Sequence, residues 1–434
     1  MNSQRIKINK IIIVLILFQF LWIKSASAQS VNWLAENILE LFKNAPWKIG
    51  QLHLYRAFYL NNAGYDSDIY YGYMGKTYPD YTLFAGPAFQ ALVPLQKLIF
   101  LDSYQSLQGA FYLKNDKERA LNFRSNNQIH FLAKKLYGRT GLSYDNLRDR
   151  FSPELTRNVR HEDLSWNGLL MIYLTHTFST AWQVSASSVN YSHTPIGDTF
   201  IDQTLDRYQY YFDFFLFYRP DVKWQYYLNG QVSFYKFKQL ESRFKNTRNL
   251  AVYLGLEFIP VLSGEKTKFT GNVNIGFKYL QPEDSRFKTA KTIVGNGLMS
   301  INLSRLLTWQ VYYHRDYDVS LYSGLLYYLQ TSFGTGLIFN LTSRLSLNNQ
   351  VLEGITNYPF SPASGFPAEK LKFYTFSSDL IIRVSRELYF NLMTDLGSRR
   401  LYPSGAKFSR QFIGVGLTYG SVPGVKARPD FYWY

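Results

Sequence analysis

Residues 266–281 read KTKFTGNVNIGFKYLQ, and apolar and polar side chains alternate along this stretch. The odd positions carry the apolar side chains Phe269, Val273, Ile275, Phe277 and Tyr279, and the even positions carry Lys268, Thr270, Asn272, Asn274 and Lys278. Because a β-strand turns successive side chains to opposite faces, the stretch predicts a strand with one apolar face and one polar, partly cationic face. The architecture then depends on whether the apolar face packs on a protein core or on lipid.

The same alternation recurs almost to the end of the chain, for example in residues 206–218, 223–235, 307–316 and 410–419. In these stretches the polar face is mainly Gln, Asn, Ser, Thr and Gly with scattered charges, and the apolar face begins and ends in Tyr, Trp or Phe. Aromatic residues at both ends of an apolar band are expected where strands cross the two interfaces of a bilayer. The pattern therefore predicts that the apolar face meets lipid and that the polar face lines an aqueous lumen.

The spacing predicts an all-β fold, a transmembrane antiparallel β-barrel of about eighteen strands over residues 48–420, with sixteen strands as the alternative count. Short gaps are predicted at 178–180, 220–221, 263–266, 304–306, 343–344 and 385–387, and long gaps at 61–81, 147–165, 193–202 and 358–369. Short turns on one side and long loops on the other match periplasmic turns and extracellular loops, with both termini in the periplasm. A soluble β-sandwich is the alternative fold.

The first 28 residues predict a signal peptide. Arg5, Lys7 and Lys10 precede the apolar residues 11–23, and Ala26-Ser27-Ala28 follows, which places cleavage between Ala28 and Gln29. The apolar run is shorter than the roughly 20 residues that a spanning helix needs. The leader carries four basic and no acidic residues, so its removal lowers the formal charge from +16 to +12. For an exported chain, this charge favours anionic headgroups or an acidic ligand over nucleic acid.

The two flanks of the predicted barrel differ from its strands. Residues 29–47 predict a short periplasmic amphipathic helix, a capping segment that could alternatively plug the lumen or lie at the inner leaflet. Trp33, Ile38, Leu41 and Phe42 share one face of that helix. Residues 421–434 form a C-terminal periplasmic tail whose terminal aromatic residues resemble the signal read by the machinery that inserts outer-membrane barrels.

The phase of the alternation turns a set of charged side chains toward the lumen. The candidate ligand-binding residues are Arg124, His130, Arg207, Asp213, Lys268, Lys278, His314, Arg383, Arg399 and Arg410, with Glu257, Asp316, Asp379 and Asp395 on the same face. An Arg or Lys on the lipid face at mid-bilayer would cost about 2–4 kcal/mol. These residues form either a salt-bridged, hydrated wall or a basic track for an anionic sugar polymer. Arg56 faces outward, either near an interface or because its strand carries a bulge.

From about residue 265 onward, several segments resemble outer-membrane β-barrel porins encoded alongside exopolysaccharide or capsule genes. These segments are residues 270–288, 303–323, 340–350, 383–400 and 412–420, with S-R-x-L turns between strands. The resemblance implies a passive channel in the outer membrane of a Gram-negative bacterium, with export of an anionic polysaccharide as one use. The partners it implies are outer-membrane lipid, the barrel-insertion machinery and periplasmic export components, and no nucleic acid.

The sequence contains few signs of catalysis. The six histidines show no H-x-x-x-H or H-E-x-x-H spacing, and there is no G-x-S-x-G or G-x-x-x-x-G-K-[ST] motif. The chain also has no cysteine, which excludes a thiolate metal site and a disulfide scaffold. We therefore expect a channel without cofactor, metal or enzymatic activity. The alternatives are a non-conducting docking barrel and an outer-membrane enzyme with a Ser-His-acid cluster drawn from neighbouring strands.

Overall fold

The computed structural model describes residues 33–70, 76–155, 157–196, 199–221, 223–258, 268–322, 325–358, 370–402 and 406–423. The predicted signal peptide with its cleavage site at Ala28 and Gln29, and the C-terminal tail beyond residue 423, lie outside this part of the chain. In the described residues, no helix is long and apolar enough to cross a membrane.

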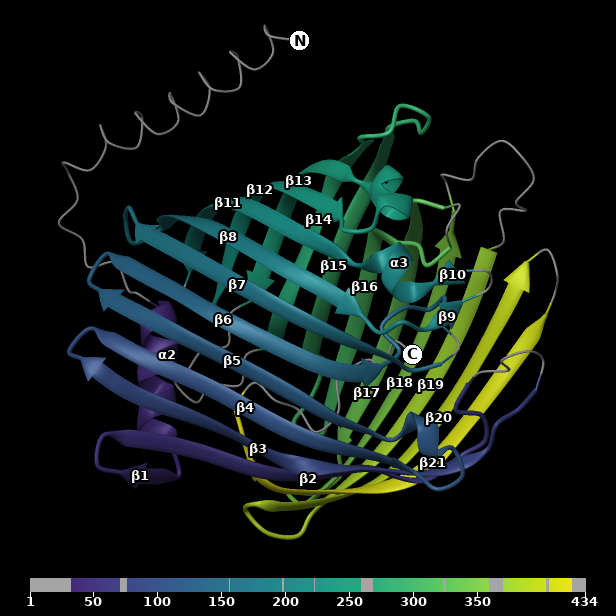
Figure 1. Cartoon of the computed structure of the whole chain (residues 1–434). Helices are drawn as coiled ribbons and strands as arrows, with labels where there is room; N and C mark the ends of the chain where they lie inside the picture. Colours follow the sequence, from purple (N-terminus) through teal and green to yellow (C-terminus); the bar gives the residue numbers. More distant parts are fainter. Residues whose placement is uncertain are drawn as a thin grey trace, which may run out of the picture.

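Eighteen long strands of the described residues form one closed antiparallel barrel, which confirms the predicted fold class and strand count (Figure 1). They are β2 (Leu52–Asp66), β3 (Asp80–Gln96), β4 (Ile99–Tyr112), β5 (Ala120–Ala133), β6 (Leu136–Asp149), β7 (Val159–Tyr173), β8 (Phe178–Tyr191), β11 (Arg207–Asp221), β12 (Trp224–Phe237), β13 (Thr247–Phe258), β14 (Phe269–Pro282), β15 (Ala290–Asn302), β16 (Leu307–Val319), β17 (Tyr327–Asn340), β18 (Leu345–Asn357), β19 (Lys370–Arg383), β20 (Leu388–Tyr402) and β21 (Lys407–Ser421). Each strand pairs with the next, and β21 closes the barrel on β2.

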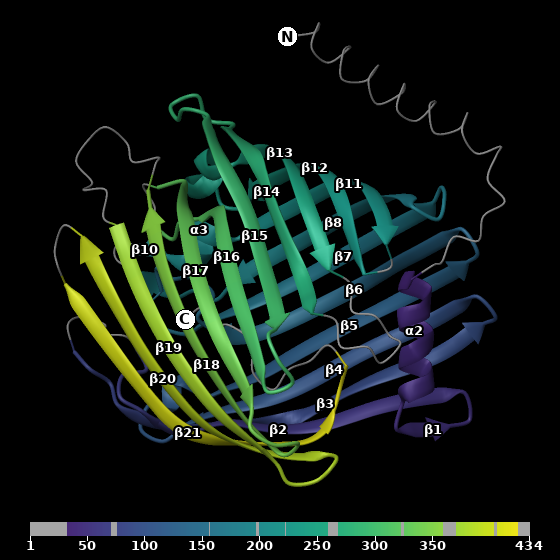
Figure 2. The ribbon, with the colours of Figure 1, turned by 180° about the vertical axis from the view of Figure 1, so that it is seen from behind.

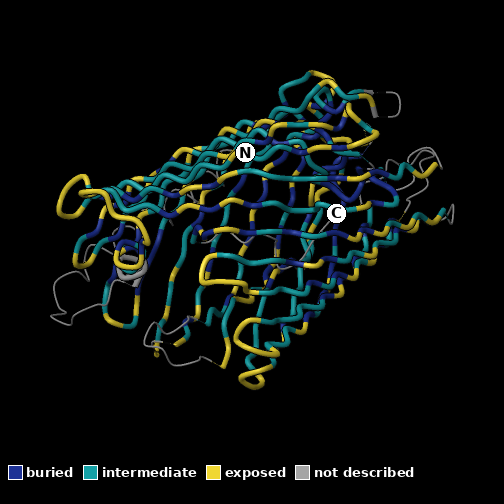
Figure 3. The backbone as a smooth tube through the Cα atoms, turned by 90° about the horizontal axis from the view of Figure 1, so that it is seen from below, coloured by how far each residue is buried: buried dark blue, intermediate teal, exposed yellow. Residues whose placement is uncertain are grey.

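The apolar faces of the strands point out of the barrel. In β14, Ile275 and Phe277 are 57% and 72% exposed, whereas Lys278, the residue after Phe277, is buried inside the barrel. Buried and exposed positions alternate in this way along the wall (Figure 3). A closed barrel satisfies its backbone hydrogen bonds internally, so an apolar exterior can face lipid without exposing a sheet edge. The apolar face of the 266–281 stretch therefore meets lipid.

The short turns at one end of the barrel share a hydroxyl cap. Ser304, Thr342 and Ser385 each accept hydrogen bonds from two backbone N–H groups two and three residues later, at 3.0–3.3 Å. Side-chain hydroxyls of this kind stabilise tight turns. Ser304 and Ser385 begin S-R-x-L segments, and Thr342 has the same place in T-S-R-L. In each turn a Ser or Thr accepts the hydrogen bonds, and the Leu three positions later begins the next strand.

Several predicted gaps were misplaced. The gaps at 61–81 and 220–221 overlap the ends of β2 and β11. The gaps at 147–165 and 178–180 leave a strand from 166 to 177 between them, but β7 spans Val159–Tyr173 and the turn follows it directly. That turn is closed by Thr175, whose hydroxyl accepts the N–H groups of Thr177 and Phe178 at 3.2 and 2.9 Å. The error in β7 arose because residues 160–163, in the outer part of the strand, are polar on both faces and resemble a loop.

A β-bulge resets the phase of β2. The register with β21 shifts between Leu60 and Ala63, and Asn62 adopts a left-handed φ of 50°. One extra residue moves the following side chains to the opposite face. Tyr59 faces inward before the bulge, and Asp66 faces inward after it. Arg56, before the bulge, faces outward as predicted, and its guanidinium lies 3.9 Å from the ring centroid of Trp47 at the rim.

Short elements occupy the two ends of the barrel. Helix α2 (Trp33–Asn44) and the short strand β1 (Trp47–Ile49) lie at the end of the short turns. The opposite end carries η2 (Asp116–Glu118), β9 (Pro195–Ile196), β10 (Thr199–Phe200), α3 (Ile201–Leu205) and η3 (Leu240–Lys245). Figure 2 shows α2 and α3 at opposite ends from the other side. The short-turn end is periplasmic, and the long-loop end is extracellular.

Candidate lumen site

Helix α2 packs on the inner wall of the barrel near its periplasmic mouth. Ile38 and Phe42 are buried in one apolar cluster with inward-facing side chains of β2 to β8, including Leu92 and Met171. Two carbonyls of the last helical turn receive partners from β2: Tyr55 Oη donates to Leu41 O at 2.7 Å, and His53 Nδ1 lies 2.7 Å from Phe42 O. These bonds satisfy groups that a helix end leaves open. The helix is thus fixed to the wall by both apolar and polar contacts.

The loop between β6 and β7, residues 150–158, crosses the lumen at the extracellular end. Arg399 on β20 donates through Nη1 to Leu155 O at 2.7 Å, and Ser152 Oγ lies 3.3 Å from Tyr328 Oη on β17. Strands β17 and β20 lie far around the barrel from β6 and β7. Because residues 152–155 are buried, this segment divides the outer part of the lumen instead of lying on its surface.

An apolar cluster fills one side of the divided lumen. It joins Leu155 of the crossing loop to Ile201 and Leu205 of α3 and to Leu321 and Leu326 of the β16–β17 loop. These side chains are removed from water, which stabilises the packing of the three loops against one another.

A carboxylate and an ammonium group lie inside this cluster. Glu154 accepts hydrogen bonds from Ser320 Oγ at 3.0 Å and from Leu321 N at 2.6 Å. Lys245 donates through Nζ to Ser320 O at 2.8 Å and to Tyr322 O at 3.1 Å. Burial raises the pKa of Glu154 to about 7, and burial lowers the pKa of Lys245 to about 7. The two side chains tie three extracellular loops together.

The other side of the lumen contains a cavity of about 610 Å³, lined by β2–β6, the β6–β7 loop, β20 and β21. Its wall mixes charged, amide and aromatic side chains. The charged ones are Arg124, Arg148, Arg150, Arg410, Asp66, Asp149 and Asp395. The volume falls within the range of small-molecule sites, about 300–1,000 Å³. The cavity is thus the part of the outer lumen where a polar solute can be accommodated.

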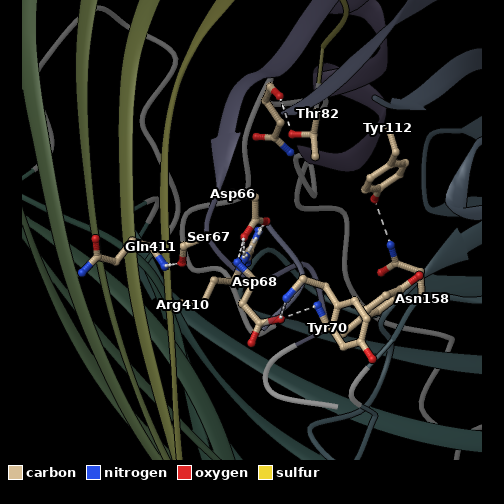
Figure 4. A network of polar contacts seen from close by, with 11 residues as sticks. Asp66, Ser67, Asp68, Tyr70, Thr82, Tyr112, Asn158, Arg410 and Gln411 are labelled. Atoms are coloured by element: carbon tan, nitrogen blue, oxygen red, sulfur yellow. Dashed lines mark hydrogen bonds and ion pairs between the residues drawn. The ribbon is translucent and has the colours of Figure 1, made fainter. Parts of the chain in front are cut away.

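A network of polar contacts at the cavity surrounds Asp66 and Arg410 (Figure 4). Arg410 grips the Asp66 carboxylate with Nε at 2.8 Å and Nη2 at 2.5 Å, a two-pronged charge-assisted pair. Asp66 Oδ1 also accepts the N–H of Asp68 at 3.0 Å. Across the cavity, Asn158 Nδ2 donates to Tyr112 Oη at 2.9 Å. Ion pairing and hydrogen bonds thus fix the extracellular ends of β2, β4 and β21 around the space.

The structure distributes the ten predicted lumen residues over several separate places. Only Arg124 and Arg410 line the cavity. Arg399 holds the crossing loop. Lys278 is buried on β14 and bonds to Asp316 at 2.7 Å, and His314 lies on the same inner wall. Asp213 accepts from Gln231 Nε2 at 2.8 Å, and Arg207 donates to Leu205 O at 3.0 Å. His130 is buried, with Nδ1 3.0 Å from Tyr137 Oη.

The remaining two predicted residues lie at the periplasmic rim. Lys268 precedes β14, and its ammonium lies 5.7 Å from the ring centroid of the outward-facing Phe269, so it is not part of the lumen wall. Arg383 ends β19, is exposed, and donates to Ser385 O at 3.2 Å. The predicted basic residues therefore form no single continuous track: most of them bond to a neighbouring acid, amide or carbonyl group.

Sequence reasoning missed Asp66, Arg148, Arg150, Glu154 and Lys245. All five lie at strand ends or in loops, where the alternation of apolar and polar residues does not predict whether a side chain points into the lumen. One signal was available: residues 148–154 read RDRFSPE, which is an unusually charged run for a loop that begins directly after a strand. The described residues contain no group of three or more His, Cys, Asp or Glu side chains placed to hold a metal ion.

Comparisons with known proteins return similarities of structure but not of sequence. No protein-family model matches the chain, and no curated protein matches its sequence. The outer membrane protein opdK of Pseudomonas aeruginosa is similar in structure, with a TM-score of 0.50 and 10% identity over 85% of this chain and 98% of that chain. A BenF-like porin of Pseudomonas fluorescens has a TM-score of 0.49 at 12% identity, and OccAB4 of Acinetobacter baumannii has 0.48 at 14% identity; each covers 85% of this chain and 98% of its own.

The apolar exterior, the closed wall and the likeness to opdK agree on architecture. At this identity the likeness concerns the fold alone. Closed antiparallel barrels with short turns on one side, long loops on the other and a lipid-facing apolar band span bacterial outer membranes. The chain therefore has the eighteen-strand fold of outer-membrane porins, and its place is the outer membrane of a Gram-negative bacterium.

Proposed function

We propose that this protein is a porin-like channel, without enzymatic activity, that passes small polar solutes along the cavity side of its lumen. The observation that carries the proposal is the cavity of about 610 Å³, with its charged and amide wall, beside an otherwise apolar filling. A wall of this kind replaces part of the hydration of a polar solute.

The solute we propose is anionic and of the size of one or two sugar units. Arg124 projects into the cavity from β5 and is exposed there, directly opposite Asp145 of β6, and we propose that its guanidinium also binds a carboxylate or phosphate of the solute. Tyr59, Tyr104 and Tyr112 provide ring faces and edges on the same wall. The four arginines exceed the three aspartates by one, so the preference for anions is modest. Passage of a polysaccharide would require both α2 and the crossing loop to move.

Conductance in planar bilayers tests the proposal. The refolded chain should give ion-conducting steps with a small preference for anions, and an acidic oligosaccharide should block them. Arg124→Glu should reverse or abolish the preference, because it changes the charge of the cavity wall by two units. Lys291→Glu makes the same charge change outside the lumen and is the matched control. Conducting steps whose selectivity is identical in wild type and Arg124→Glu would exclude the cavity as the path.

A non-conducting docking barrel is the second candidate, because α2 packs on the inner wall near one end and the crossing loop reaches across the lumen near the other. In that case the folded, inserted protein would give no current. Removal of residues 33–44 separates the two functions: current that appears only after removal indicates a plugged channel, and continued silence indicates a scaffold.

A further inference from the structure

Three cationic side chains form one row across adjacent strands at the extracellular rim. Lys372 on β19 is the direct cross-strand partner of Arg400 on β20, and Arg400 is the direct partner of Lys407 on β21. Directly opposed residues of antiparallel strands have Cβ atoms about 4.5–5.5 Å apart. The three charges therefore lie side by side.

All three side chains point away from the lumen. Their sequence neighbours Phe373, Arg399 and Phe408 belong to the opposite face, and Phe373 and Arg399 are buried inside the barrel. The next outward-facing row toward the membrane centre contains Tyr374, Ser398 and Ser409, and the row below it contains the exposed Phe376 and Leu396 together with Gln411 on β21. This order, from apolar to aromatic and hydroxyl to cationic, places the row at the depth of the outer-leaflet headgroups.

Like charges placed directly opposite each other destabilise a sheet. Among the described residues, no ion pair joins Lys372, Arg400 or Lys407 to a carboxylate. The nearest acid on this face in the pairing pattern is Glu353 on β18, in the row of Tyr374, and that carboxylate accepts the Tyr374 hydroxyl. Arg400 and Lys372 instead lie over the ring of Tyr402, 4.9 and 6.0 Å from its centroid. The row therefore has an uncompensated positive charge.

We propose that this row binds the phosphate of an outer-leaflet glycolipid. The guanidinium of Arg400 can grip a phosphate with two N–H groups, and the two flanking ammonium groups add point charges. A lipid is the occupant because the rows directly below are lipid-facing, so an attached acyl chain would lie along Phe376 and Leu396. The inference does not depend on whether the barrel conducts.

Other outward cations at this rim lack the arrangement. On the far wall, Arg248 pairs with Gln281 and Phe234, and Lys291 pairs with Tyr279. Lys236 pairs with Tyr208 and forms an ion pair with Glu283. These three residues provide a control of equal charge on a different part of the same rim.

The experiment measures retention of a bisphosphorylated glycolipid by the full refolded chain in detergent, by native mass spectrometry. Each cation near a membrane surface contributes about 1 kcal/mol to anionic lipid binding, so the variant Lys372→Ser/Arg400→Ser/Lys407→Ser should bind about 100-fold more weakly. The control variant Lys236→Ser/Arg248→Ser/Lys291→Ser should retain the lipid. Arg400→Ser alone should weaken lipid binding about fivefold, and it replaces the triple variant if that variant does not refold.

Two further arms identify the ligand. The dephosphorylated glycolipid should bind as weakly to wild type as the phosphorylated form binds to the triple variant, and millimolar inorganic phosphate should not displace the lipid. Equal retention of both glycolipids, equal loss in the two triple variants, or displacement by inorganic phosphate would each overturn the proposal.

Discussion

Removal of the Phe42 side chain should release α2 from the periplasmic mouth. The ring is 8% exposed and has its centroid 5.0 Å from that of Phe100 and 5.1 Å from that of His53. A buried Phe→Ala change costs about 3–5 kcal/mol, and the lower end applies here because the site lies at a mouth that can relax. At about 1.4 kcal/mol per factor of ten, 3 kcal/mol raises the ratio of displaced to docked helix about 100-fold.

Single-channel recording measures this ratio as open probability. Phe42→Ala should increase the open time about 100-fold, up to saturation, with little change in barrel stability because the strand pairing is untouched. Leu39→Ala, on the exposed side of the same helix at 50% exposure, should change it little. If Phe42→Ala and wild type show equal open probability, while deletion of residues 33–44 opens the pore, then the contacts of Phe42 do not hold the helix. If the deletion also leaves the current unchanged, α2 does not obstruct the channel.

Three further results are expected. The pKa of Glu154 is raised from 4.5 to about 7, so Glu154 stabilises the crossing loop below about pH 4.5 and loses that contribution as the pH rises through 7. The pKa of Lys245 is lowered from 10.5 to about 7, so Lys245 stabilises the loop above about pH 10.5 and loses that contribution as the pH falls through 7. Proteolysis at residues 150–158 should therefore be fastest near neutral pH, and Glu154→Gln should abolish the protection on the acid side; a flat pH profile would contradict the assignment. Asp66→Asn removes the carboxylate from Arg410 and should increase anion selectivity in reversal-potential measurements, and unchanged selectivity would mean that this pair does not line the path. Gly64→Ala would bring a Cβ against Ile413 O and should lower stability by about 1–3 kcal/mol in denaturant unfolding, whereas Gly230→Ala, with open space around it, should not.

The barrel wall could be predicted from the sequence because the residue type at each position depends on which face of its own strand the side chain occupies. In β14, each side chain meets either lipid or lumen, and the two environments select different residue types at a period of two. The turns closed by Ser304, Thr342 and Ser385 mark boundaries between strands, and such boundaries made it possible to count the strands. The prediction failed in β7, since residues 160–163 are polar on both faces and show no alternation of apolar and polar side chains.

The interior was harder to predict because its contacts are not local. Arg399 was placed inside the lumen by its phase, but its partner Leu155 O lies 244 residues earlier in a loop. The inward direction of Asp66 could not be predicted, because a single extra residue in β2 turns every later side chain of that strand to the opposite face. A count of lumen-facing charges therefore overstates the free charge, because pairs such as Lys278 and Asp316 neutralise each other on the wall.

The position of the cavity indicates which obstruction controls passage. Tyr59 and Tyr104 line the cavity from β2 and β4, and both also pack in the apolar cluster that holds α2. The cavity and helix α2 thus contact the same part of the barrel wall. The crossing loop borders the cavity on the side of the apolar cluster, whereas α2 packs on the wall that the cavity shares with β2 and β4. We therefore expect displacement of the helix to change the conductance of a path through the cavity more than displacement of the loop does.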